Sequence, residues 1–92
     1  MTDEEIIRVK GNSSAKALGA AISHAVYDGR HVTLRAIGAG AVNQAFKATA
    51  IARSFTAARG IDLLIRPGFD TVTMPDGASI SAAIMVVIPS RA

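Results

Sequence analysis

Two segments with the two-residue apolar period of a strand are each followed by a segment with the three-to-four-residue period of a helix. The 92-residue chain then continues with two more strand-like segments, so the predicted order is β-α-β-α-β-β. Strand–helix–strand crossovers are right-handed, which places both helices on one face of the sheet. The sequence therefore predicts an α/β fold, a two-layer sandwich of the α+β kind with a mixed four-stranded sheet.

Breaks and caps set the expected limits of these elements. Ser13 or Ser14 is a suitable N-cap for the first helix, and a glycine follows each helix as its C-terminal stop. An irregular arm is expected over residues 67–74, before a turn at residues 75–77. The expected strands span residues 5–10, 31–37, 61–66 and 79–88, and the expected helices span residues 13–28 and 41–58.

Length and composition favour one compact domain. Half of the residues are apolar, and a chain of this size buries enough surface for one two-layer core, so we expect a single domain over residues 1–92, frayed at residues 1–5. The chain has no cysteine, which excludes disulfides and thiolate metal sites. The acidic N-terminus is typical of neither a signal nor a transit peptide, and no apolar run reaches the roughly 20 residues of a membrane span. We expect a cytoplasmic protein that needs no cofactor.

Positive charge dominates the chain after its first residues. The formal net charge is +3, but residues 3–5 hold three of the seven acids, and ten bases against four acids follow them. A basic field of this kind favours a polyanion such as nucleic acid, whereas surface charge for solubility is the simpler interpretation. Nucleic acid is therefore a candidate partner on charge alone.

The residue types used in catalysis are not grouped. His24 and His31 have no acid or nucleophile beside them in a motif, and the carboxylates form no pair at helical or strand spacing. General acid–base and metal catalysis both require such groups to converge. We therefore expect a non-enzymatic protein with no catalytic and no metal-binding residues.

The junction between the second strand and the second helix is the most distinctive local pattern. Gly38, Ala39 and Gly40 lead directly into the helix, so that free backbone N–H groups and the positive end of the helix dipole point outward together, as in phosphate sites. As a dinucleotide fingerprint the pattern is incomplete, because Asn43 occupies the third glycine position. The glycines equally suit a tight turn with close helix–sheet packing, so both interpretations stay open.

Basic and polar residues surround this junction in the predicted topology. Because the first two strands run parallel, the loop after the first strand should lie beside the glycine turn. Aromatic side chains for base stacking are scarce, so contact directed at the nucleic-acid backbone, with weak sequence specificity, is expected. The predicted binding residues along this edge are Lys10, Lys16, Gly38, Ala39, Gly40, Asn43, Gln44 and Lys47, with Arg35, like Arg8 and Arg66, expected on the open face of the sheet.

The second helix carries apolar side chains around much of its circumference. It is rich in alanine, and Phe46 and Phe55 are too far apart in helical angle to share one face. Met85 and Val87 are expected on the side of the last strand that points away from the helices. Alanine is also a good helix former, which is the simpler explanation, but the pattern favours a homodimer or a higher even oligomer.

Residues 36–53, AIGAGAVNQAFKATAIAR, closely resemble the signature of the stage V sporulation protein S (SpoVS) family. The segments VKGNSSAKALGAAI, IDLLIRPGF and AIMVVIP fall where that family has its matching segments, so the resemblance covers nearly the whole chain. The family in turn resembles Alba, a small dimeric nucleic-acid-binding fold with the same order of elements. The resemblance implies an Alba-like fold and a regulatory, nucleic-acid-binding role in bacterial sporulation or development.

Carried over by position, the resemblance implies a basic loop near residues 10–16, a second loop at residues 38–40 and a hairpin arm at residues 69–78. Alba proteins typically carry a basic residue beside the glycine of the second loop, where this chain has none, and their arm is usually basic, whereas this one holds Asp70 and Asp76. These departures imply modest, salt-sensitive affinity for DNA or RNA.

Two other functions stay open on the sequence. A protein–protein adaptor without direct nucleic-acid binding would dock a partner on the second helix and the last strand. A small-ligand or nucleotide sensor at the glycine turn is the third hypothesis.

Overall fold

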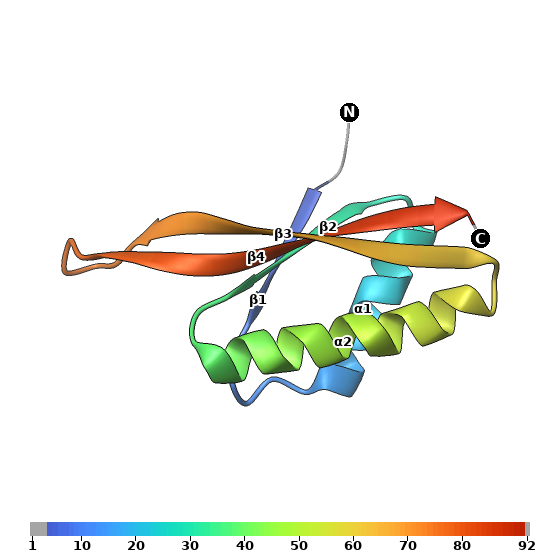
Figure 1. Cartoon of the computed structure of the whole chain (residues 1–92), viewed down its shortest axis with the longest axis horizontal. Helices are drawn as coiled ribbons and strands as arrows, with labels where there is room; N and C mark the ends of the chain where they lie inside the picture. Colours follow the sequence, from blue (N-terminus) through green and yellow to red (C-terminus); the bar gives the residue numbers. More distant parts are fainter. Residues whose placement is uncertain (1–3, 92) are drawn as a thin grey trace.

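The computed structural model describes residues 4–91, and its element order confirms the predicted β-α-β-α-β-β succession (Figure 1). The elements are β1 (Glu4–Val9), α1 (Ala15–Tyr27), β2 (His31–Ala36), α2 (Ala39–Ala57), β3 (Ile61–Thr73) and β4 (Ser79–Arg91). Glu4 and Glu5, expected to be frayed, are instead the first two residues of β1, and residues 1–3 lie outside the described part. None of the described helices is both long and apolar enough to cross a membrane.

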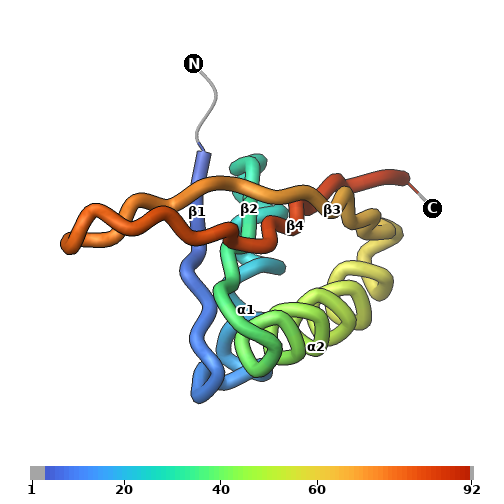
Figure 2. The backbone as a smooth tube through the Cα atoms, turned by 60° about the vertical axis from the view of Figure 1, so that its left-hand side comes forward, coloured from blue at the N-terminus to red at the C-terminus, as the bar shows by residue number. Residues whose placement is uncertain are grey.

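The four strands form one mixed sheet in the order β1-β2-β4-β3. β1 and β2 are parallel, whereas β4 pairs antiparallel with both of its neighbours. Both helices lie under the same face of this sheet, and the other face is open (Figures 1 and 2). The predicted two-layer sandwich is therefore confirmed.

The core lies between the sheet and the helices and is built from small and branched apolar residues. From β2, Val32 and Leu34 are buried, as the two-residue period predicts, and Ile22 of α1 packs against them. The contribution of α2 is a stripe of fully or nearly fully buried alanines, Ala41, Ala45, Ala48 and Ala52. These short side chains let the helix axis lie close to the sheet.

The two helices approach each other closely at Gly19 of α1. A Cβ atom at Gly19 would lie 2.6 Å from Cγ2 of Ile51 and 3.2 Å from the backbone oxygen of Ala48, both on α2. Any side chain at this position would push the helices apart. Ser14 caps the start of α1 by accepting a hydrogen bond from the N–H of Ala17, as expected from the sequence.

Strand β3 is longer and more regular than predicted. The irregular arm expected over residues 67–74 is wrong for most of that segment, because β3 pairs with β4 without interruption from Ile61↔Arg91 to Thr73↔Ser79. Beyond the pair Ala36↔Ala83, where β2 ends, these two strands continue together as a projecting arm (Figure 1). The prediction failed because Pro67 and Gly68 suggested a break, whereas an edge strand tolerates both residues.

The predicted face of β4 is also wrong. Val87 is buried in the core and Met85 packs against it, because in the pairing register Val87 lies opposite Val32 and Met85 opposite Leu34. Directly opposed residues of neighbouring strands share one face of a sheet. The C-terminal half of β4 is apolar on both faces, so alternation alone could not identify the inner one.

The close helix contact gives the first testable expectation. Gly19→Ala should lower the free energy of unfolding by about 1–3 kcal/mol, because the added methyl group overpacks the α1–α2 contact and outweighs the better helix propensity of alanine. Urea denaturation followed by circular dichroism measures this. Ile51→Ala in the same chain should restore part of the loss, and strictly additive effects of the two substitutions would show that the contact is not the cause.

Candidate nucleic-acid interface

The loop after β1 and the start of α2 touch each other, as the parallel pairing of β1 and β2 predicts. A Cβ atom at Gly40 would lie 3.6 Å from the Cα atom of Gly11. The loop is closed by two hydrogen bonds, from the N–H of Lys10 to Oγ of Ser13 and from the N–H of Ser13 to the carbonyl of Lys10. Lys10 is therefore held at a defined position beside the glycine turn.

Gln44 joins α2 to this loop. Its Nε2 donates a 2.7 Å hydrogen bond to the carbonyl oxygen of Ser13, and the neighbouring Asn43 amide lies 3.5 Å from Gln44 Oε1. Gln44 is half-buried, whereas Asn43 is exposed. The geometry thus gives Gln44 a positioning role that its place in the sequence did not reveal, and leaves Asn43 accessible.

The first turn of α2 is open at its N-terminus. Gly38 is the N-cap, with φ of 91° and ψ of 157°, and it supplies no side-chain hydrogen bond to the backbone N–H groups that follow in the described helix. Gly38, Ala39 and Gly40 are all exposed. The first N–H groups of a helix have no partner within the helix, so those of the exposed Ala39 and Gly40 lie at the positive end of the helix dipole without an intrahelical acceptor.

Acidic residues neutralise bases at the end of the molecule opposite the glycine turn. Arg30 forms ion pairs with Glu5 at 2.9 Å and Asp28 at 3.4 Å, and Arg53 contacts Asp62 at 2.6 Å. The Arg53 guanidinium that hydrogen-bonds the Asp62 carboxylate lowers the pKa of that carboxyl below its usual value.

At the end of the molecule that holds the glycine turn, five bases have no ion-pair partner among residues 4–91. These bases are Arg8, Lys10, Lys16, Arg35 and Lys47. Their positive charge is therefore free to act on an outside anion.

The predicted site residues fall into three groups in the structure. The edge formed by the two touching loops holds Lys10, Lys16, Gly38, Ala39, Gly40, Asn43 and Gln44. Lys47 is exposed on α2, about 12 Å along the helix from its first residue at 1.5 Å per residue. Arg35 lies on the open face, where its partners in the register are Arg8 on β1 and Ile84 on β4.

Arg8 is the residue that sequence reasoning left out of the binding set. It was placed on the open face, but its exact match with Arg35 across β1 and β2 needed the strand register. A groove that joins both arginines to the tip of the arm was not foreseen at all.

The arm itself is not basic. Its turn is closed by a 2.8 Å hydrogen bond from the N–H of Met74 to the carbonyl of Ala78, and Oδ1 of Asp76 accepts from the N–H of Ala78. Asp70 accepts similarly from the N–H of Thr71. Both carboxylates are thus used to shape the backbone, and the arm contributes negative rather than positive charge.

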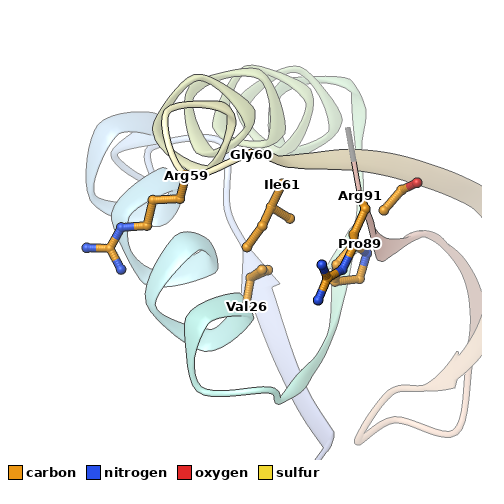
Figure 3. A pocket seen from close by; sticks show the side chains of 7 residues that line it. Val26, Arg59, Gly60, Ile61, Pro89 and Arg91 are labelled. Atoms are coloured by element: carbon orange, nitrogen blue, oxygen red, sulfur yellow. The ribbon is translucent and has the colours of Figure 1, made fainter.

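A second hollow, of about 590 Å³, lies at the far end of the molecule between α1, the start of β3 and the end of β4 (Figure 3). It includes Arg59 and Arg91, but Figure 3 shows that the two guanidinium groups point in different directions. That of Arg59 lies 4.0 Å from the centre of the Tyr27 ring, in a cation–π contact. These arginines do not converge on one ligand position.

The fold belongs to the class of small Alba-like folds. The structure is similar to that of Alba from Thermoplasma volcanium, with a TM-score of 0.59 and 18% sequence identity, over 95% of this chain and 100% of the other. Residues 5–90 match the family described as Stage V sporulation protein S (SpoVS). The chain belongs to the SpoVS family, which confirms the resemblance drawn from residues 36–53.

The two glycines of the turn should respond differently to substitution. Gly38→Ala should cost about 1–3 kcal/mol of unfolding free energy, because its backbone conformation is one that essentially only glycine adopts. Gly40→Ala should stay within about 0.5 kcal/mol of the wild type, because its Cβ would make ordinary contacts. Thermal unfolding of both variants checks this, and equal losses would contradict the assigned backbone roles.

Proposed function

We propose that this protein is a non-enzymatic regulator that binds DNA or RNA through the edge formed by the β1–α1 loop and the start of α2. The observation that carries the proposal is the group of bases without ion-pair partners in residues 4–91 beside the open N-terminus of α2. Lysines and free backbone N–H groups are the donors that phosphate oxygens accept from. Membership of the SpoVS family supports a role in bacterial sporulation or developmental gene regulation.

The composition of the edge points to contact with the phosphate backbone. Its residues are lysines, small residues and amides, and no aromatic side chain belongs to the predicted set. Stacking platforms for bases need exposed aromatics at the site, so weak sequence specificity follows. Binding that rests on phosphates is strongly weakened by salt.

A homodimer is part of the proposal, through a surface that keeps the second helix of the original prediction but replaces the last strand with β3. Phe69 of β3 is 82% exposed and Phe46 of α2 is 66% exposed. Phe69 is separated from the buried Leu63 by an even number of positions along β3, so both side chains lie on the helix side of the strand. On α2, Phe46 is seven residues from Arg53, whose guanidinium contacts Asp62 of β3, so Phe46 lies on the side of the helix that faces β3. β3 is an edge strand of the sheet. The phenylalanines and this edge together offer an apolar surface that a second copy would cover.

The adaptor hypothesis has the same surface in its favour. If Phe46 and Phe69 were covered by another protein, they would serve docking rather than self-association, and the basic edge would be surface charge for solubility. Val87, once part of that hypothesis, is excluded as a docking residue because it is buried in the core.

Charge reversal tests the nucleic-acid proposal. Lys16→Glu with Lys47→Glu should reduce affinity for short duplex DNA, single-stranded DNA and RNA at least tenfold, measured by fluorescence anisotropy. For the wild type, about four phosphate contacts predict a slope near −3 to −4 of log affinity against log salt. Arg66→Glu with Arg91→Glu is the matched control and should lose much less. Wild-type affinity in the lysine variant would show that the edge is not the site.

Self-association is tested separately by analytical ultracentrifugation. Phe69→Asp should shift the protein toward the monomer, because it places a charge in the proposed apolar contact. Leu64→Asp, which introduces the same charge at a 53% exposed position on the opposite face of β3, should leave the assembly unchanged. A monomeric wild type at all concentrations would favour the adaptor hypothesis.

A further inference from the structure

A groove of about 530 Å³ lies on the open face of the sheet, between the end of β1 and the tip of the arm. Arg8, Lys10 and Arg35 line one side, and residues 72–75 of the arm line the other. The described residues that line the groove include no acid, and its size falls in the range of roughly 300–1,000 Å³ typical of sites for one small ligand.

Two arginines in this groove lie next to each other, and no acidic residue neutralises their positive charges within residues 4–91. Arg8 and Arg35 are direct partners in the parallel register of β1 and β2, and like charges placed opposite each other destabilise a sheet. Neither takes part in an ion pair within residues 4–91. Glu4 and Asp70 line an adjacent hollow together with Arg35, but neither carboxylate lies within ion-pair distance of it. An outside anion bound between the arginines would relieve their repulsion.

The rest of the lining suits a flat, partly apolar group. Ile37, Val72 and Met74 supply aliphatic surface beside the cationic side, and Thr73 adds a hydroxyl. Guanidinium groups bind phosphate through paired hydrogen bonds and also stack on base faces. A phosphate joined to a planar ring therefore matches the chemistry of both sides of the groove.

We propose that this groove binds one unpaired nucleotide, with its phosphate on Arg8 and Arg35 and its base against the arm. The inference rests on the proposed function and deepens it, because it assigns single-stranded nucleic acid to a part of the open face that meets the backbone-binding edge only at the β1–α1 loop, where Lys10 lies. The bases of a duplex stack on one another, so none offers a free face to lie against the arm. The nucleotide is either part of a strand or a free nucleoside monophosphate, which share this chemistry.

The test compares three probes on the wild type and on Arg8→Gln with Arg35→Gln. The probes are adenosine 5′-monophosphate, a short single-stranded oligonucleotide and a duplex of the same length. We expect the variant to lose about tenfold or more in affinity for the single strand, as the loss of two charge-assisted contacts predicts, and to bind the duplex within about threefold of the wild type. Arg66→Gln, on the same face but outside the groove, is the matched control and should bind all probes as the wild type does.

The outcomes separate this inference from the proposed function. Equal losses for single strand and duplex, or no loss for either, would overturn the groove as a nucleotide site while the function stands. A wild type that binds adenosine 5′-monophosphate but neither polymer would support the groove, with a free nucleotide as its ligand, and contradict the proposed function. No binding of any probe would overturn both.

Two further measurements do not depend on the binding of the variant. Removal of the opposed charges should leave the melting temperature equal to or above that of the wild type, and a clear decrease would show that the arginines serve folding instead. In the wild type, the single strand should shift the amide NMR signals of Arg35 and Thr73. Shifts confined to residues 38–44 would place the ligand at the edge and overturn the inference.

Discussion

The close approach of α2 to both α1 and the sheet is the contact on which the other features depend. It is possible because α2 presents alanines to the core and because Gly19 of α1 has no side chain where Ile51 passes. Only Ile37 and Gly38 separate the end of β2 from the start of α2, and Gly38 provides the backbone conformation of this short turn. The same closeness brings the β1–α1 loop against the first turn of α2. The candidate interface is therefore a direct product of packing between small residues.

The ion pairs among residues 4–91 all lie at the end of the molecule opposite the glycine turn. The carboxylates that form ion pairs lie at the end where β2 begins and α2 finishes, and they hold Arg30 and Arg53. The opposite end keeps its bases without such partners in the described chain, next to the open helix N-terminus. A net charge of +3 understates this asymmetry, because the field that a polyanion meets depends on which bases are already paired.

Much of the fold follows from the sequence alone, because periodicity, caps and crossover handedness are local or general rules. The order of elements and the meeting of the first two loops were predicted in this way. The inner face of β4 was not, because both faces of its C-terminal half are apolar and the register with β2 decides between them. The roles of Gln44 and Arg8 depended on contacts between segments far apart in the chain. The groove is formed by the end of β1 and the tip of the arm, which are far apart in the sequence, so no local sequence pattern predicts it.

The arm has a consequence for the motions of the molecule. Beyond Ala83 its strands hydrogen-bond as a ladder to each other and no longer to β2. Such a segment opens locally at a lower free energy than the core, so its amide hydrogens should exchange with solvent well before those of β2. The arm, which forms one wall of the groove, can therefore open and close while the helices and the lysine-bearing edge stay folded. Ligand entry at the groove is thereby separated from the global stability of the domain.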